Sequence, residues 1–76
     1  MKEIPIGRYR HYKGHEYRVL GIAHHSETLE PLVVYQALYD SEDFGPNALW
    51  ARPLEEFLET VEMGGTQVPR FERIGD

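Results

Sequence analysis

The chain has 76 residues, which is room for one small domain, and it contains no cysteine. Disulfide frameworks, cysteine nucleophiles and zinc–cysteine sites are therefore excluded, and the lack of cysteine is typical of a cytoplasmic protein. A hydrophobic content of 41% excludes disorder, and a formal net charge of -5 argues against a general DNA or RNA binder, whose affinity comes from cations on phosphates. We expect residues 1–76 to form a single domain.

The sequence shows neither a membrane-spanning stretch nor a secretion signal. No apolar run approaches the length of about 18 residues that a membrane helix needs. Residues 1–5 lack the apolar region of a signal peptide. We therefore expect a cytoplasmic location and no membrane partner.

The first predicted elements are two strands, residues 7–12 and 15–24, joined by Lys13-Gly14. A two-residue connection that ends in glycine, between tyrosine- and valine-rich runs, is typical of a tight hairpin. That turn places Arg10 opposite Tyr17, so one face of the hairpin carries arginines and tyrosines together.

The rest of the chain reads as further short strands, turns and one helical turn. Residues 32–39 are rich in β-branched and aromatic side chains and form the predicted central strand, whereas residues 40–47 read as an exposed acidic loop. Pro53 can begin a helical turn, because its missing N–H does no harm at a first helical position. The remaining predicted features are a bulge or a close backbone approach at Gly21, a strand over residues 48–52, and a second hairpin of residues 60–63 and 66–68 around Gly64-Gly65.

Five to six short strands, tight turns and one short helical turn predict an all-β fold, a small and strongly bent antiparallel barrel. A helix bundle is excluded, because no helical period lasts longer than about two turns. Such a barrel holds little more than one layer of side chains, so its nine aromatic residues cannot all be interior. Some of these rings must reach the surface.

Five ordered segments can be compared with known families: Gly7-x-Tyr9-Arg10-His11-Tyr12-Lys13-Gly14, His25-Ser26-Glu27-Thr28, the central strand, Leu49-Trp50-x-Arg52-Pro53-Leu54-x-x-Phe57 and Val68-Pro69-Arg70-Phe71. Over roughly residues 7–74 they closely resemble the bacterial domain of unknown function 1653 family. The acidic loop at residues 40–47 looks longer than the family's usual connection. The resemblance implies an SH3-like barrel and implies no activity, since a fold does not define a function.

The four histidines titrate near neutral pH, which makes them candidates for metal binding or catalysis. His24 and His25 would point to opposite faces of a strand, and His11 and His15 straddle the turn, so no pair has the spacing of a metal site. Ser26 beside His25 lacks the context of an activated nucleophile. We expect no metal, no cofactor and no catalytic residue, and keep a small His-dependent enzyme or metal-binding protein as an alternative.

Charge is distributed unevenly along the chain. Residues 1–25 contain five of the eight Lys and Arg but two of the thirteen Asp and Glu, a formal +3, which leaves -8 for residues 26–76. Basic residues interleaved with tyrosines on the first hairpin are typical of a surface that stacks bases and holds phosphates. The acids downstream weigh against that use, so a single-stranded nucleic-acid binding module is an alternative and not the leading hypothesis.

Exposed rings on adjacent strands of a small barrel can line a groove for an extended peptide, because rings bury a large area at low entropy cost. The leading hypothesis is a non-catalytic binding module for a peptide or protein partner. An exposed strand edge could also pair two copies into a homodimer. The predicted ligand-binding residues are Tyr12, Tyr17, Tyr35, Tyr39, Trp50 and Arg52.

Overall fold

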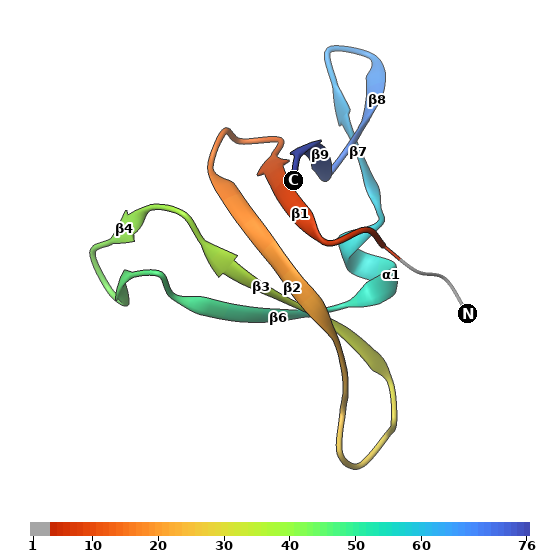
Figure 1. The fold of residues 1–76 in the computed structure, drawn as a ribbon. Coiled ribbons are helices and arrows are strands. Elements are labelled where there is room, and N and C mark those ends of the chain that lie inside the picture. The colour runs from red at the N-terminus through yellow and green to blue at the C-terminus, as the bar shows by residue number, and fades with distance from the viewer. Residues whose placement is uncertain (1–3) are drawn as a thin grey trace.

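The computed structural model describes residues 4–76, a nearly all-β chain with one short helix (Figure 1). Residues 1–3, which form part of the start considered for a signal peptide, lie outside the described residues. The main sheet is antiparallel with the strand order β6-β3-β2-β1-β9. Its strands are β1 (Gly7–His11), β2 (Glu16–His24), β3 (Pro31–Ala37), β6 (Leu49–Pro53) and β9 (Phe71–Gly75).

Two small hairpins and the helix complete the architecture. Strand β4 (Asp40–Ser41) pairs with β5 (Gly45–Pro46), strand β7 (Thr60–Met63) pairs with β8 (Thr66–Pro69), and α1 (Leu54–Phe57) directly follows β6. Figure 1 shows the β7–β8 hairpin extending away from the main sheet. The predicted second hairpin and the helical turn after Pro53 are confirmed. The predicted acidic loop contains the short β4–β5 ladder.

The all-β class is confirmed, but the predicted barrel does not close. Within residues 4–76 the sheet ends at β6 on one side and at β9 on the other, and no ladder joins these two strands. Helix α1 packs against β3 and β6 and contributes Leu54 and Phe57 to the core. Helical side chains thus cover a part of the core that a closing ladder would cover in a complete barrel.

The turn of the first hairpin is one residue longer than predicted. The Gly14 N–H donates to the His11 carbonyl at 2.7 Å, and the His11 N–H donates to the His15 carbonyl. His11 and His15 therefore close the loop, which comprises residues 12–14. Gly14 has a φ of +111°, and three-residue hairpin loops end on such a glycine. Tyr17 consequently lies opposite Tyr9, and the predicted register, shifted by one residue, is wrong.

This one-residue difference separates the tyrosines of the first hairpin from its arginines, because a shift of one position moves a side chain to the other face. Tyr9 and Tyr17 pack on the core side of the sheet. Arg8 and Arg10 alternate with them and approach the carboxylate of Glu16 at 3.8 and 3.7 Å on the outer side. The predicted face that combines Arg8 and Arg10 with Tyr17 is therefore not formed.

The core is built mainly from aromatic rings. Phe57 and Phe71 stack with centroids 4.1 Å apart and planes 4° apart. Tyr9 meets Phe57 edge-on, and Tyr35 meets both phenylalanines edge-on, with all three centroid distances at 5.5 Å. The exposed fractions of these four residues lie between 2% and 7%. Because rings bury large areas, they compensate for the small size of the core.

The predicted bulge at Gly21 is confirmed. The register of the β2–β3 ladder shifts between Val19 and Gly21, which leaves Leu20 between them without a partner in the ladder. Val19 is fully buried, whereas Leu20 is 44% exposed. An extra residue of this kind bends a strand and increases its twist, and Figure 1 shows the β2–β3 hairpin curving away past the rest of the sheet.

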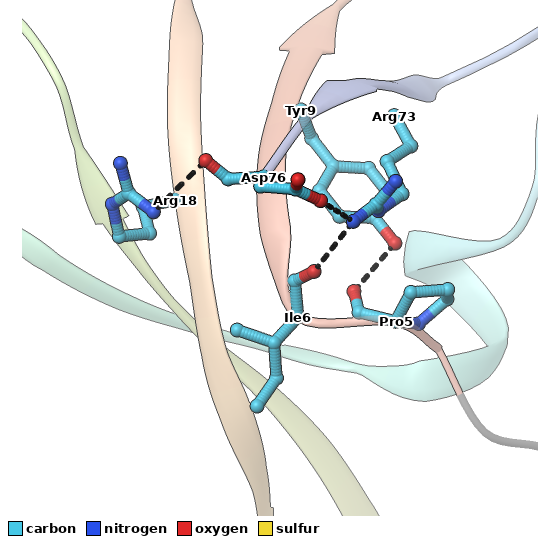
Figure 2. Close-up of polar contacts among 6 residues, drawn as sticks. All are labelled: Pro5, Ile6, Tyr9, Arg18, Arg73 and Asp76. Atoms are coloured by element: carbon cyan, nitrogen blue, oxygen red, sulfur yellow. Dashed lines mark hydrogen bonds and ion pairs between the residues drawn. The ribbon is translucent and has the colours of Figure 1, made fainter.

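Polar contacts tie the segment before β1 to the end of β9 (Figure 2). The Tyr9 hydroxyl donates to the Pro5 carbonyl at 2.8 Å. The Arg73 guanidinium donates to the Ile6 carbonyl at 3.2 Å and to the Asp76 carboxylate at 2.8 Å. Of these contacts, the one between Arg73 and Ile6 joins β9 to the segment before β1, in addition to the β1–β9 ladder.

Candidate ligand-binding site

Four of the six predicted residues come together beside the core, from three strands and the segment after β3. The Tyr17 ring meets the Tyr35 ring edge-on at 5.2 Å and the Tyr39 ring edge-on at 5.6 Å. The hydroxyl oxygens of Tyr17 and Tyr39 are 3.0 Å apart, within hydrogen-bond distance. Tyr35 is only 4% exposed, so its ring belongs to the core, while Tyr17 and Tyr39 are half-buried.

Arg52 from β6 completes this group. Its Nε–H donates to the Tyr35 hydroxyl at 3.3 Å, and its guanidinium carbon lies 5.7 Å from the centroid of the Phe71 ring. The bond to Tyr35 raises the pKa of Arg52, against the opposing effect of burial. Arg52 is therefore a fixed and fully charged group at the border between the core and the surface.

Two histidines lie beside this group, one on Tyr39 and the other on Phe71. His15 stacks on Tyr39 with ring centroids 4.1 Å apart, and His11 meets Phe71 edge-on at 4.9 Å. The backbone N–H of Lys13 donates to His11 Nδ1 at 3.1 Å, so the neutral ring carries its proton on Nε2. We call the set Tyr17, Tyr35, Tyr39, Arg52, His11 and His15 the tyrosine–arginine cluster.

Sequence reasoning missed the two histidines as members of this group. It considered them as metal ligands or catalytic groups, and not as partners of the aromatic rings. The signal that would have found them is alternation: with the observed register, His15 falls on the same face of β2 as Tyr17. His11 falls on the face of β1 that carries Tyr9 and lies opposite Phe71 in the ladder.

Protonation in the cluster follows from burial and from the charge of Arg52. Burial raises the pKa of Tyr17 well above its ordinary 10.0, as does its hydrogen bond with Tyr39, while Arg52 opposes both. Burial lowers the pKa of His11 from 6.5, and the charges of Arg52, Arg70, Lys13 and His15 lower it further. At neutral pH Tyr17 and His11 are consequently neutral, and Arg52 supplies a positive charge.

The other two predicted residues lie outside the cluster. The Tyr12 ring packs against His11 at 4.5 Å. It borders a cavity of about 270 Å³ between the end of β1 and the β7–β8 hairpin, which is also bordered by Arg10, His11, Met63, Val68, Pro69 and Glu72.

Trp50 lies opposite Tyr35 in the β3–β6 ladder, and its ring packs edge-on against exposed Phe44 at 5.2 Å. Its indole Nε1 is buried and has no hydrogen-bond partner among residues 4–76.

The pattern proposed for nucleic acid, basic residues interleaved with tyrosines, is divided between two faces. Glu16 lies within 4 Å of both Arg8 and Arg10, so the charges of these arginines are partly neutralised on the outer face. Tyr9 and Tyr17 are on the other face. Tyr9 and Tyr17 therefore do not share a base-stacking surface with Arg8 and Arg10.

The remaining histidine candidates lie in a polar turn. His25 Nδ1 accepts the backbone N–H groups of Glu27 and Thr28 at 3.1 and 3.3 Å, so this ring stabilises the connection between β2 and β3. In the part of the chain that the structure describes, no three His, Asp or Glu side chains gather in the manner of a metal site. None of the helices of residues 4–76 has the length and apolar character to cross a membrane.

Comparison with known proteins identifies relatives without a described activity. Residues 7–73 match the family described as protein of unknown function (DUF1653). The chain is also similar to a protein of that family from Bordetella bronchiseptica, known from its crystal structure. The sequences are 40% identical, the TM-score is 0.86, and the match covers 99% of this chain and 92% of the other. No curated protein matches the chain.

Proposed function

The chain belongs to the DUF1653 family of proteins of unknown function, and from that premise we propose that it is a non-catalytic binding module for a peptide of a partner protein. The proposed binding surface is the tyrosine–arginine cluster. Its main support is that half-buried Tyr17 and Arg52, from separate strands, both contact the buried Tyr35, and that half-buried Tyr39 packs on Tyr17. Tyrosine and arginine are among the residue types that dominate binding hot spots in protein recognition.

The cluster also suits binding because its side chains are already held in place. Tyr39 is fixed between the stacked His15 ring and the Tyr17 hydroxyl. Arg52 is fixed by the Tyr35 hydroxyl and the Phe71 ring. A ligand that contacts them immobilises few additional rotamers, so less of the interaction energy is lost to ordering.

A displayed peptide library, selected against the wild-type chain, tests this proposal. The selected peptides are expected to bind at least about tenfold more weakly to Tyr39→Ala, because the central ring of the surface is lost. Arg10→Ala is the matched control, since Arg10 lies on the outer face of the same hairpin and should leave the affinity unchanged.

Two results would contradict the proposal. One is the absence of any selected peptide. The other is an equal loss of affinity in Tyr39→Ala and Arg10→Ala when both variants keep the melting temperature of the wild type. A single-stranded oligonucleotide that binds at low salt and dissociates steeply as salt is added would favour the nucleic-acid alternative.

A further inference from the structure

Arg52 has hydrogen-bond donors that the protein does not use. Its Nε–H is bonded to Tyr35, but its two terminal amino groups have no acceptor among residues 4–76. Every other arginine of that range donates to, or pairs with, a carboxylate or a backbone carbonyl. Glu56 acts on Arg52 electrostatically but forms no ion pair with it. A guanidinium without an anionic partner is thus left at the border of the core.

The unused part of this guanidinium is held in a defined orientation. Tyr35, which anchors Nε, is 4% exposed, and Phe71, over which the group lies, is 7% exposed. Both supports belong to the aromatic core, so they cannot move freely. The two terminal amino groups form a planar fork whose geometry matches the two oxygens of a carboxylate or a phosphate.

A second unused donor belongs to the same cluster. The Tyr17 and Tyr39 hydroxyls share one hydrogen bond, which uses the hydrogen of one of them, and the other hydrogen has no acceptor among the described residues. Tyr17 and Arg52 contact the same two core residues: the Tyr17 ring meets the rings of Tyr35 and Phe71 edge-on at 5.2 and 5.8 Å, while Arg52 donates to the Tyr35 hydroxyl and lies over the Phe71 ring. No carboxylate forms an ion pair with any member of the tyrosine–arginine cluster in residues 4–76.

We propose that the cluster is a receptor for a single oxyanion. The terminal amino groups of Arg52 bind two of its oxygens, and the free hydroxyl hydrogen of the Tyr17–Tyr39 pair donates to one of them. Carboxylate and phosphate share this chemistry. Under the proposed function, on which this step rests, the oxyanion is a carboxylate of the bound peptide, from an acidic side chain or a chain end.

Titration of the full isotope-labelled chain with small anions, followed by NMR, tests this inference. Acetate and phosphate are the probes, and chloride at matched ionic strength is the reference. Acetate or phosphate is expected to shift the Arg52 Nε–H resonance and the ring resonances of Tyr17 and Tyr39 in a saturable manner, whereas chloride is not. Equal responses to all three anions, or no response, would overturn the inference.

Variants decide whether the response belongs to this site. Arg52→Gln is expected to weaken acetate or phosphate binding at least about tenfold, since a charged hydrogen-bonding partner is lost. Arg10→Gln is the control and should bind as the wild type. The double variant Tyr17→Phe/Tyr39→Phe keeps both rings and removes both hydroxyls, so it should weaken binding severalfold even if Arg52→Gln proves unfolded. Unchanged binding in folded Arg52→Gln, or in this double variant, would contradict the proposed donors.

The same probes separate this inference from the proposed function. If selected peptides bind equally well after every carboxylate is replaced by an amide, the oxyanion receptor is wrong and the peptide module stands. If acetate saturates the site but no peptide is ever selected, the receptor stands and the peptide module is wrong. Competition between phosphate and a single-stranded oligonucleotide at Arg52 would support the receptor and assign its anion to nucleic acid.

Discussion

The hydroxyl oxygen of Tyr17 lies 3.0 Å from that of Tyr39, a contact that joins β2 to the segment after β3. The ring of Tyr17 also meets Tyr35 and Phe71 edge-on, at 5.2 and 5.8 Å. Tyr17 is therefore the residue through which half-buried Tyr39 is attached to the core. Its protonation and its hydroxyl should influence both stability and binding.

Stability should fall at alkaline pH in a manner that depends on Tyr17. Burial raises the pKa of Tyr17 in the folded state above its ordinary 10.0. The neutral Tyr17 side chain therefore makes its full contribution to the free energy of unfolding below pH 10.0, and this contribution is lost as the pH rises through and beyond that value. Denaturant unfolding of wild type and Tyr17→Phe across this range measures the effect. The variant should lose less free energy of unfolding, and equal losses would contradict the assignment.

His11 should titrate below its ordinary pKa of 6.5. Burial and the charges of Arg52, Arg70, Lys13 and His15 disfavour its charged form in the folded state. Its contribution to stability is complete above pH 6.5 and is lost as the pH falls through the lower folded value. NMR titration should give a midpoint below 6.5 that rises in Arg52→Gln, and a midpoint above 6.5 would disprove this prediction.

Gly7→Ala should destabilise the fold through a close backbone approach. A Cβ at this position would lie 2.5 Å from the Gly75 carbonyl oxygen of the neighbouring strand, and φ is +147°. We expect a loss of at least about 2 kcal/mol in the free energy of unfolding. Gly64→Ala is the control: nothing lies within 4 Å of its Cβ position, so only a backbone strain of about 1 kcal/mol is expected. Denaturant unfolding of both variants should show this difference, and equal losses would be inconsistent with it.

Phe57→Ala should remove the centre of the aromatic core. Phe57 is 2% exposed and stacks on Phe71, so truncation should lower the free energy of unfolding by about 3 to 5 kcal/mol. That is comparable to the whole stability of a small domain, so the variant should be largely unfolded by circular dichroism. Phe44→Ala is the matched control, because Phe44 is 63% exposed and contacts Trp50 edge-on, and it should lose about 1 kcal/mol or less. A stable, cooperatively folded Phe57→Ala would refute this view of the core.

Local signals predicted much of the fold. Gly64-Gly65 between β7 and β8, Pro53 before α1 and the bulge at Gly21 each require a particular backbone conformation, which a sequence can reveal. The first hairpin could not be settled in this way. Lys13-Gly14 fits a two-residue or a three-residue loop, and both faces of its strands mix polar and aromatic residues, so hydrophobic pattern did not select the register.

The candidate site could be predicted only in part, and the reason is similar. Tyrosine is compatible with the core, the surface and the border between them, so sequence alone could not separate buried Tyr35 from half-buried Tyr17 and Tyr39. Tyr12 was grouped with them, but it borders the cavity beside β8. The open edges of the sheet at β6 and β9 likewise depend on long-range packing that no local pattern describes.

NMR mapping of a selected peptide on the wild-type chain tests the central claim most directly, because it distinguishes the cluster from the cavity beside the β7–β8 hairpin. The account predicts that the largest shifts occur at Tyr17, Tyr39 and Arg52, with saturation at one peptide per chain. The largest shifts at Tyr12 and Val68, with the Arg52 resonance unchanged, would contradict it.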